Sequence, residues 1–238
     1  MKLRQISATC LISILITSSA FAASKRAELK DRLDSAEEVL TKVMTISDSS
    51  IPMGIIKKAT CVGVVPGLIK GAFIFGGQYG QGVVTCRTPK GWSAPVFIRL
   101  AGGSFGLQIG GQATDLVLVA VNEKGFQDLL RSKFKIGGDV SASAGPVGRT
   151  SQASTDWKMN AELLTYSRSK GLFAGIDLDG TTVTQNTEDT ELFYGPDHDY
   201  KDILIGSVGV PPEAKPFVST VIKYFVKAQD QPIKPLGK

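Results

Sequence analysis

The chain has 238 residues but only one histidine, His198, and three cysteines. A serine hydrolase of the common type needs a histidine base and often a G-x-S-x-G elbow, and that elbow does not occur. A tetrahedral zinc site needs several cysteine or histidine ligands, and His198 in GPDHDY has none beside it. An exposed loop imidazole is the simpler interpretation of His198. These absences argue against an enzyme and indicate no cofactor.

Apolar runs long enough to cross a membrane are also missing. A short apolar run at residues 11–16 follows the basic residues Lys2 and Arg4 and precedes a small-residue end at Ala22. This layout predicts a secretory signal peptide over residues 1–22, cleaved near Ala22, and a periplasmic or secreted protein. Its removal lowers the formal charge from +5 to +3, because it contains two basic residues and no acid. So small a charge does not predict nucleic-acid binding.

Only Cys61 and Cys86 remain after such a cleavage. In an oxidising compartment, a pair of cysteines in an exported protein is a candidate disulfide. A bond between them would close a loop of about 25 residues and stabilise the fold by roughly 3–4 kcal/mol in the chain-entropy model. Two buried apolar thiols are the alternative.

Amphipathic helices are predicted at both ends of the mature chain. Between residues 25 and 43, the apolar residues recur at helical spacing and form one stripe: Leu29, Leu33, Ala36, Leu40 and Val43. The opposite side mixes four basic with five acidic residues between positions 25 and 38, which is typical of a solvated helix that docks on its own core. A second apolar stripe spans residues 211–228.

The middle of the chain has the short β-branched and aromatic runs of strands, broken by glycine and proline. Strands are predicted within residues 60–122, where 104–110 alternate and 115–122 are apolar almost throughout, and again at 139–148, 159–166 and 172–178. A short helix is predicted at 123–135 and a polar loop at 179–191. The predicted fold is α+β, a strongly curved, glycine-rich antiparallel sheet, barrel-like, with amphipathic helices at both ends.

The stretch KGAFIFGGQYGQGVVTC, residues 70–86, raises the question whether its glycines hold a phosphate. A phosphate loop needs a helix after its glycines, and the residues after Gly82 stay strand-like. Phe73, Phe75, Tyr79 and Val83 fall on one side of a period-two pattern, so we expect a bending strand pair. In IDLDG, Asp177 and Asp179 could bind a cation, but a turn at Asp179-Gly180 explains them equally simply.

A series of motifs resembles the SYLF-domain family, in its exported bacterial branch. The motifs are VVP (64–66), KGAFIFGGQYGQGV (70–83), GWSAP (91–95), GGSFGLQIG (102–110), AGPVGR (144–149), YSRSKGLFAG (166–175) and LFYG (192–195). Their order matches the family from about Leu29 to Gly195. We therefore expect a SYLF-like domain over residues 23–195 and a C-terminal extension with a helix over 196–238.

The resemblance implies a non-enzymatic domain that binds lipid or a membrane surface, with anionic phospholipid as the expected ligand. Eukaryotic members bind through a basic amphipathic N-terminal segment, and the basic residues of this segment here are Lys25, Arg26, Lys30 and Arg32. The other basic candidates are Lys57, Lys58, Lys70, Lys223 and Lys227. Each could equally be a solvated surface residue.

Some family members associate with actin, but export would separate this chain from actin. The alternative function is a structural or protein-interaction component of the cell envelope, without lipid dependence. Glycine-rich aromatic strands would suit a protein partner as well as a membrane.

Overall fold

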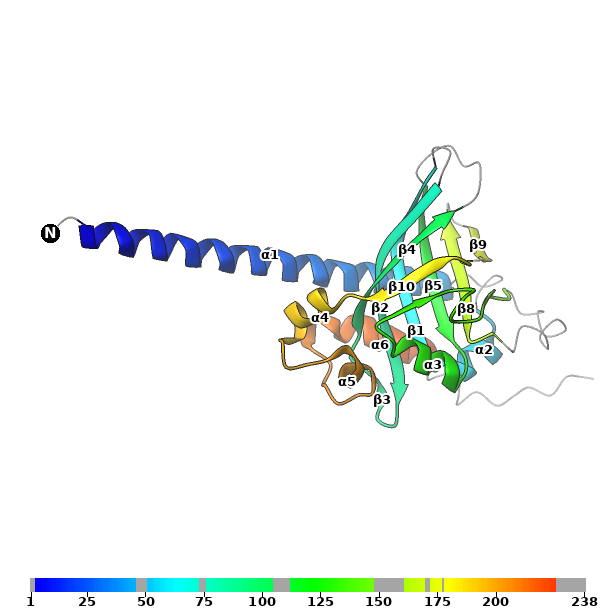
Figure 1. Cartoon of the computed structure of the whole chain (residues 1–238). Coiled ribbons are helices and arrows are strands. Elements are labelled where there is room, and N and C mark those ends of the chain that lie inside the picture. The colour runs from blue at the N-terminus through cyan, green and yellow to red at the C-terminus, as the bar shows by residue number, and fades with distance from the viewer. Residues whose placement is uncertain are drawn as a thin grey trace, which may run out of the picture.

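The computed structural model describes residues 3–45, 51–72, 76–104, 112–147, 161–169, 172–176 and 178–225. Within them, a strongly curled sheet of ten strands forms a half-barrel, and helices from both ends of the chain pack on it (Figure 1). The predicted α+β class with a strongly curved sheet is confirmed.

Eight strands follow the order β6-β10-β4-β2-β1-β5-β8-β7, while β3 pairs with β2 and β9 with β8. Their bounds are β1 Cys61–Ala72, β2 Gly76–Thr88, β3 Gly91–Trp92, β4 Val96–Ser104, β5 Gln112–Ala120, β6 Lys133–Lys135, β7 Ala142–Ala144, β8 Leu163–Ser169, β9 Leu172–Gly175 and β10 Thr181–Gln185. Among these strands, β7 and β8 pair in parallel and the other pairs are antiparallel. The predicted antiparallel pairing thus holds for the other strand pairs, and β7 with β8 is the exception among the described strands.

The helices are α1 Leu3–Thr45, α2 Met53–Lys58, α3 Glu123–Leu129, α4 Thr187–Tyr194, α5 Tyr200–Leu204, the 3₁₀ turn η3 Pro212–Ala214 and α6 Lys215–Phe225. Helix α1 begins well before the predicted residue 25, and its N-terminal part extends away from the sheet (Figure 1). Within the described residues, no helix combines the length and apolar character needed to span a bilayer.

Each face of the sheet carries an apolar layer. On one face, which we call the helical face, side chains of β1, β2, β5 and β8 pack with α1 and α6. All five residues of the predicted α1 stripe are buried there, as are Phe217, Val221 and Phe225 of α6. On the other face, α3 and α5 cover a layer that includes Ile98, Leu118 and Val183. The side chains of this second layer pack together as an apolar cluster. Both predicted amphipathic helices are confirmed.

Two segments differ from the predictions. The helix predicted at 123–135 ends at Leu129, and Phe134 lies in strand β6, where it pairs with Val183 and is buried. The loop predicted at 179–191 contains β10 and α4. Strand β10 alternates buried with half-exposed residues but is built mainly of threonine, so its period is hidden in a polar composition. Asn186 caps the start of α4, because its side chain accepts a hydrogen bond from the backbone nitrogen of Asp189.

The glycines of β2 lie where β1 bulges. The pairing of β1 with β2 shifts between Val64 and Ile69. A Cβ on Gly82 would lie 2.2 Å from the carbonyl oxygen of Val64, and one on Gly80 would lie 2.7 Å from Val65. These two glycines therefore permit close strand contact, which confirms that they belong to a strand and not to a phosphate loop.

The alternation predicted for this stretch holds for Tyr79 and Val83, whose pairing partners also share one side of the sheet. Phe73 and Phe75 lie outside the described residues, as does Asp177. Asp179 lies in the predicted turn, and Gly180 adopts the positive φ of 84° that such a turn requires.

Replacing Gly82 with alanine is expected to lower the free energy of unfolding by about 1–3 kcal/mol, because the methyl group would press on the backbone of β1. Urea denaturation of both proteins measures the change. Gly77→Ala is the matched control in the same strand, since the carbonyl oxygen of Gly102 would be 4.0 Å from the new methyl group. Equal costs for the two substitutions would contradict the close contact at Gly82.

Candidate functional site

Arg32, a predicted lipid contact, lies in the protein interior between α1 and α4. Its Nη1 donates to Oδ2 of Asp189 at 2.7 Å, and its Nη2 donates to Oε1 of Glu28 at 2.9 Å. The side chains of Arg32 and Asp189 are only 9% and 2% exposed. The guanidinium also lies 5.7 Å from the ring centre of Phe97 on the helical face. Arg32 thus connects α1 to α4 and to the sheet.

The other basic residues of α1 are paired as well. Arg26 donates to Glu213 at 2.8 Å and to the carbonyl of Phe193 at 2.7 Å. This guanidinium lowers the pKa of Glu213 below its ordinary value, mainly through the side-chain hydrogen bond. Lys25 and Lys30 form ion pairs at 3.0 Å with Glu28 and at 2.5 Å with Asp34.

These four cations therefore serve contacts within the chain, and three of them, Lys25, Arg26 and Arg32, join α1 to α4 or η3. A carboxylate paired with a cation offsets its positive charge, so that the cation attracts an anionic lipid headgroup less strongly. The structure thus gives the predicted α1 site residues a structural role.

The remaining predicted cations are spread over other elements. Lys57 and Lys58 end α2, and Lys223 on α6 is exposed with its Nζ 4.9 Å from the ring centre of Tyr224. The backbone of Lys70 lies in β1 opposite Gln78. Lys227 lies outside the described residues.

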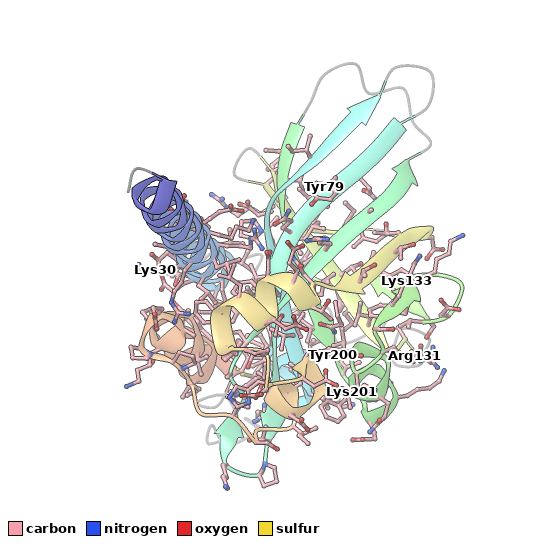
Figure 2. The ribbon with its side chains drawn as sticks, turned by 60° about the vertical axis from the view of Figure 1, so that its left-hand side comes forward. Lys30, Tyr79, Arg131, Lys133, Tyr200 and Lys201 are labelled. Carbon is pink, nitrogen blue, oxygen red and sulfur yellow. A yellow bond between two sulfur atoms is a disulfide. The ribbon has the colours of Figure 1, made fainter. Side chains whose placement is uncertain are left out.

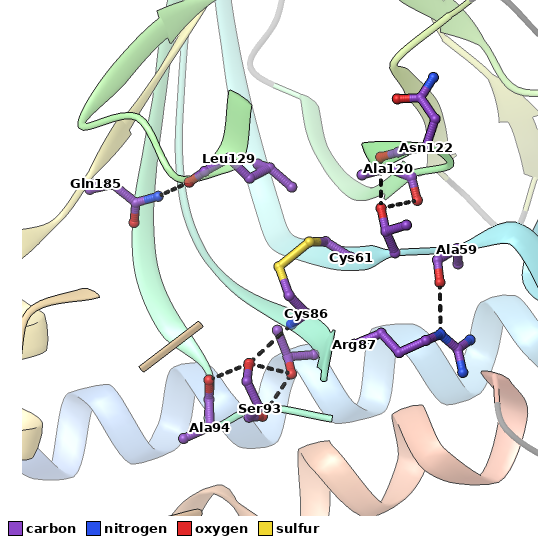
Figure 3. The surroundings of a disulfide bond; sticks show 12 residues. Ala59, Cys61, Cys86, Arg87, Ser93, Ala94, Ala120, Asn122, Leu129 and Gln185 are labelled. Carbon is purple, nitrogen blue, oxygen red and sulfur yellow. Dashed lines mark hydrogen bonds between the residues drawn. A yellow bond between two sulfur atoms is a disulfide. The ribbon is translucent and has the colours of Figure 1, made fainter. Parts of the chain in front are cut away.

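The predicted disulfide between Cys61 and Cys86 is confirmed. The two residues are direct partners in the β1–β2 pairing, and both are buried. Figure 3 shows the bond beside Ser93, whose Oγ accepts a hydrogen bond from the backbone nitrogen of Cys86 at 3.1 Å. Nearby, Nε of Arg87 donates to the carbonyl of Ala59 at 3.1 Å. The bond therefore secures the end of the β1–β2 hairpin nearest α2.

Part of the helical face is not covered by helices, and strand register defines it as two adjacent rows of residues. Directly paired residues of a sheet point to the same side. The first row crosses β5, β1, β2, β4, β10 and β6, and the second crosses β2, β4, β10 and β6. Together the rows form what we call the open sheet face: Ala113, Ile69, Tyr79, Ala101, Thr182 and Lys135, then Gln81, Arg99, Thr184 and Lys133.

The open sheet face joins apolar to basic side chains. Ile69 and Tyr79 are direct partners and are 58% and 47% exposed, although both are large. Figure 2 shows Tyr79 on the strands above α4 and Lys133 at the β6 edge. Lys133, Lys135 and Arg99 supply three positive charges, and none of the ten residues is acidic.

Two polar atoms of this face have no partner among the described residues. The Nε of Arg99 and the Oε1 of Gln81 are buried without a hydrogen bond, although these residues are direct partners. Arg99 has one weak ion pair, 3.6 Å from its Nη2 to the largely exposed Glu188. Among the described residues, its charge is therefore only partly compensated.

The sequence could not show this face. Its cations come from β4 and β6, and the residues of β6 were predicted to be helical, which would have put Lys133 and Lys135 on different sides. Strand β10, which joins β4 to β6, was predicted to be a loop. The one available signal was the alternation of Lys133, Phe134 and Lys135, which is the period of a half-buried strand.

A cleft of about 410 Å³ lies around α4 and α5, and its lining includes Glu191, Asp197, His198, Asp199 and Asp202. His198, predicted as an exposed loop imidazole, is partly buried at this cleft. In the part of the chain that the structure describes, no three metal-ligating side chains gather as a metal site requires.

Residues 101–224 match the protein family described as "Ysc84: Las17-binding protein actin regulator". The chain belongs to this family. This confirms the resemblance to the SYLF domain; the description is that of a binding and regulatory protein. The match runs past Gly195, where the recognised motifs end, and takes in α5 and α6.

Similar proteins come from yeast and animals. Protein YSC84 of Saccharomyces cerevisiae is 35% identical over 176 residues, which are 72% of this chain and 37% of the yeast protein. LAS seventeen-binding protein 3 of the same species is 35% identical over 71% of this chain and 38% of its own. SH3 domain-containing YSC84-like protein 1 of Xenopus laevis is 35% identical over 79% of this chain and 58% of its own. The chain thus spans roughly two to three fifths of these relatives.

Proposed function

We propose that this chain is a non-enzymatic module of the cell envelope that binds the surface of anionic phospholipid membranes through its open sheet face. The observation that carries the proposal is the composition of that face: three cations and two exposed large side chains, with no acid among its ten residues. Membership of the family supports a binding role.

Two contributions favour binding of the open sheet face to an anionic membrane. A lysine or arginine near an anionic membrane surface contributes about 1 kcal/mol each. Tyrosine favours the boundary between headgroups and acyl chains, because its ring is apolar and its hydroxyl is polar, and Ile69 beside it adds apolar area. Together these contributions favour a surface that rests on the headgroups without spanning the bilayer.

The disulfide supports a location outside the cytoplasm. Structural disulfides persist in oxidising compartments and are rare in the cytosol. With the predicted signal peptide over residues 1–22, this favours a periplasmic or secreted protein, so that actin is not the expected partner.

Vesicle co-sedimentation tests the function. The protein is expected to bind vesicles that contain anionic phospholipid and to bind neutral vesicles only weakly. Its affinity for the anionic vesicles should fall as the salt concentration rises. The variant Arg99→Gln/Lys133→Gln/Lys135→Gln is expected to bind anionic vesicles about 100-fold more weakly, since three contributions of about 1 kcal/mol are lost.

The matched control is Lys90→Gln/Lys201→Gln/Lys215→Gln, which removes the same charge from exposed positions outside the open sheet face. It should retain most of the binding. If both triple variants lose the same affinity, net charge and not this face governs binding. Absence of binding to anionic vesicles at low salt would refute the proposed function.

A protein partner is the second candidate. The exposed Ile69–Tyr79 pair favours it, since aromatic side chains are enriched in protein interfaces, and the family is named for binding Las17. Native mass measurements on envelope extracts distinguish the two candidates: a stable complex that forms without lipid supports the protein partner.

A further inference from the structure

Two buried carboxyl groups meet where α3 packs beside β8. Asp128 on α3 and Glu162, just before β8, are 3% and 5% exposed, and their side chains are within hydrogen-bonding reach of each other. Two ionised carboxylates at this separation and burial would repel each other. A proton on one of them would replace that repulsion by a hydrogen bond.

The surrounding charges decide which carboxyl group holds the proton. Glu162 accepts hydrogen bonds from the Nζ of Lys124 and, at 2.6 Å, from the backbone nitrogen of Ser141. Asp128 has one ion pair, from its Oδ1 to the Nε of Arg131 at 3.3 Å, and the side chain of Arg131 is largely exposed. Its Oδ2 is buried and has no other partner among the described residues. Glu162 is thus the stabilised anion, and Asp128 is the group with an unused oxygen.

We propose that Asp128 and Glu162 share one proton, held on Oδ2 of Asp128, and that this bond is a pH-responsive fastening of α3 to the segment before β8. Because α3 leads through residues 130–132 into β6, the fastening also positions Lys133 and Lys135. Its effect on lipid binding rests on the function proposed above.

The signs of the two shifts define a pH window. Burial raises the pKa of Asp128 above its ordinary value, so its stabilisation is present at low pH and is lost as the pH rises through the raised value. For Glu162, the hydrogen bonds of Lys124 and Ser141 outweigh burial and lower its pKa, so its stabilisation is lost only as the pH falls through that lowered value. The fastening is complete at a pH between the lowered pKa of Glu162 and the raised pKa of Asp128. It weakens as the pH rises above the pKa of Asp128.

Carboxyl-carbon NMR titration tests the shared proton directly. Asp128 should titrate above the ordinary value of about 3.9, and in Glu162→Gln its pKa should fall toward that value. The variant Asp128→Asn carries a permanent N–H donor in place of the proton. A pKa of Asp128 at or below about 3.9 would overturn the proposal.

Hydrogen exchange of α3 and β6, corrected for intrinsic pH dependence, measures the fastening. Between about pH 4, near the ordinary pKa of aspartate, and pH 8, opening in the natural protein should increase about tenfold for each unit by which the pKa of Asp128 is raised, whereas Asp128→Asn should show no such rise. Asp197→Asn, an exposed acid, is the control and should behave like the natural protein. Equal pH dependence in all three proteins would overturn the proposal.

Anionic vesicle binding at pH 5 and pH 8 links the fastening to function. The natural protein should bind more weakly at pH 8, and Asp128→Asn should lose that difference. If neither binds at any pH, the proposed function fails, while the titration and the exchange data still decide the shared proton. If both bind with the same pH dependence, the fastening does not control the open sheet face and that part of the proposal is wrong.

Discussion

Replacing Asp189 with alanine is expected to lower the free energy of unfolding by about 3–5 kcal/mol, the cost of leaving a buried charge without its partner. The guanidinium of Arg32 would lose its hydrogen bond of 2.7 Å and remain almost enclosed between α1 and α4. Asn186, whose Nδ2 donates to Oδ2 of Asp189 at 2.5 Å, would lose an acceptor as well. Urea denaturation followed by circular dichroism measures the change.

Glu188→Ala is the matched control, because Glu188 precedes Asp189 on the same helix but is largely exposed. It should cost less than about 1 kcal/mol. A second variant, Arg32→Met with Asp189→Leu, removes both charges and should recover much of the loss. If the two single alanine variants cost the same, the buried pair is not what fastens α1 to α4.

The expected cost at Asp189 changes how lipid binding by α1 variants should be interpreted. A substitution at Arg32 would weaken vesicle binding by unfolding the domain, even if Arg32 never touches a lipid. Loss of binding at Arg32 therefore identifies a lipid contact only where the free energy of unfolding is unchanged. Variants of Lys133 and Lys135 on the open sheet face avoid this problem, because both residues are exposed.

The helices at both ends could be predicted from the sequence, because their information is local. Apolar residues recur at helical spacing over residues 29–43 of α1 and again in α6. The sequence of each helix therefore indicates which side is buried. The disulfide was predicted from composition and the expected compartment, since only two cysteines follow the predicted signal peptide. Strand register was not needed for either result.

The segments at β6, β10 and α4 were mispredicted because tertiary contacts decide them. Strand β6 has only three residues and is held by its pairing with β10. Helix α4 has a polar surface and is held by Asp189, which faces a residue of α1 that is 157 positions earlier in the sequence. No local pattern contains such a contact.

The long-range ion pairs of α1 could not be predicted for the same reason. Arg32 and Arg26 belong to the predicted lipid-binding segment, but their partners Asp189 and Glu213 lie 157 and 187 positions away in the sequence. The open sheet face instead depends on the register of several strands. One step of register moves every side chain of a strand to the opposite face, so such a surface can be seen only once the pairing is known.

Removing the disulfide with Cys61→Ala/Cys86→Ala is expected to lower the free energy of unfolding by about 3–4 kcal/mol, since the bond closes a loop with a sequence separation of 25. The unfolded chain gains freedom, while the buried pairing of β1 with β2 loses little contact. Denaturation without reductant measures the difference, and reductant should bring the natural protein to the midpoint of the variant.

The double variant is its own control in reductant, where its midpoint should not move. Two reactive thiols in the unfolded natural protein without reductant, beyond Cys10 if residues 1–22 are retained, would refute the bond.

The register that begins at Cys61 and Cys86 continues along the same two strands to Ile69 and Tyr79. Reduction is therefore expected to weaken vesicle binding in proportion to the lost stability, so that the proposed site would work best where the bond persists, outside the cytoplasm.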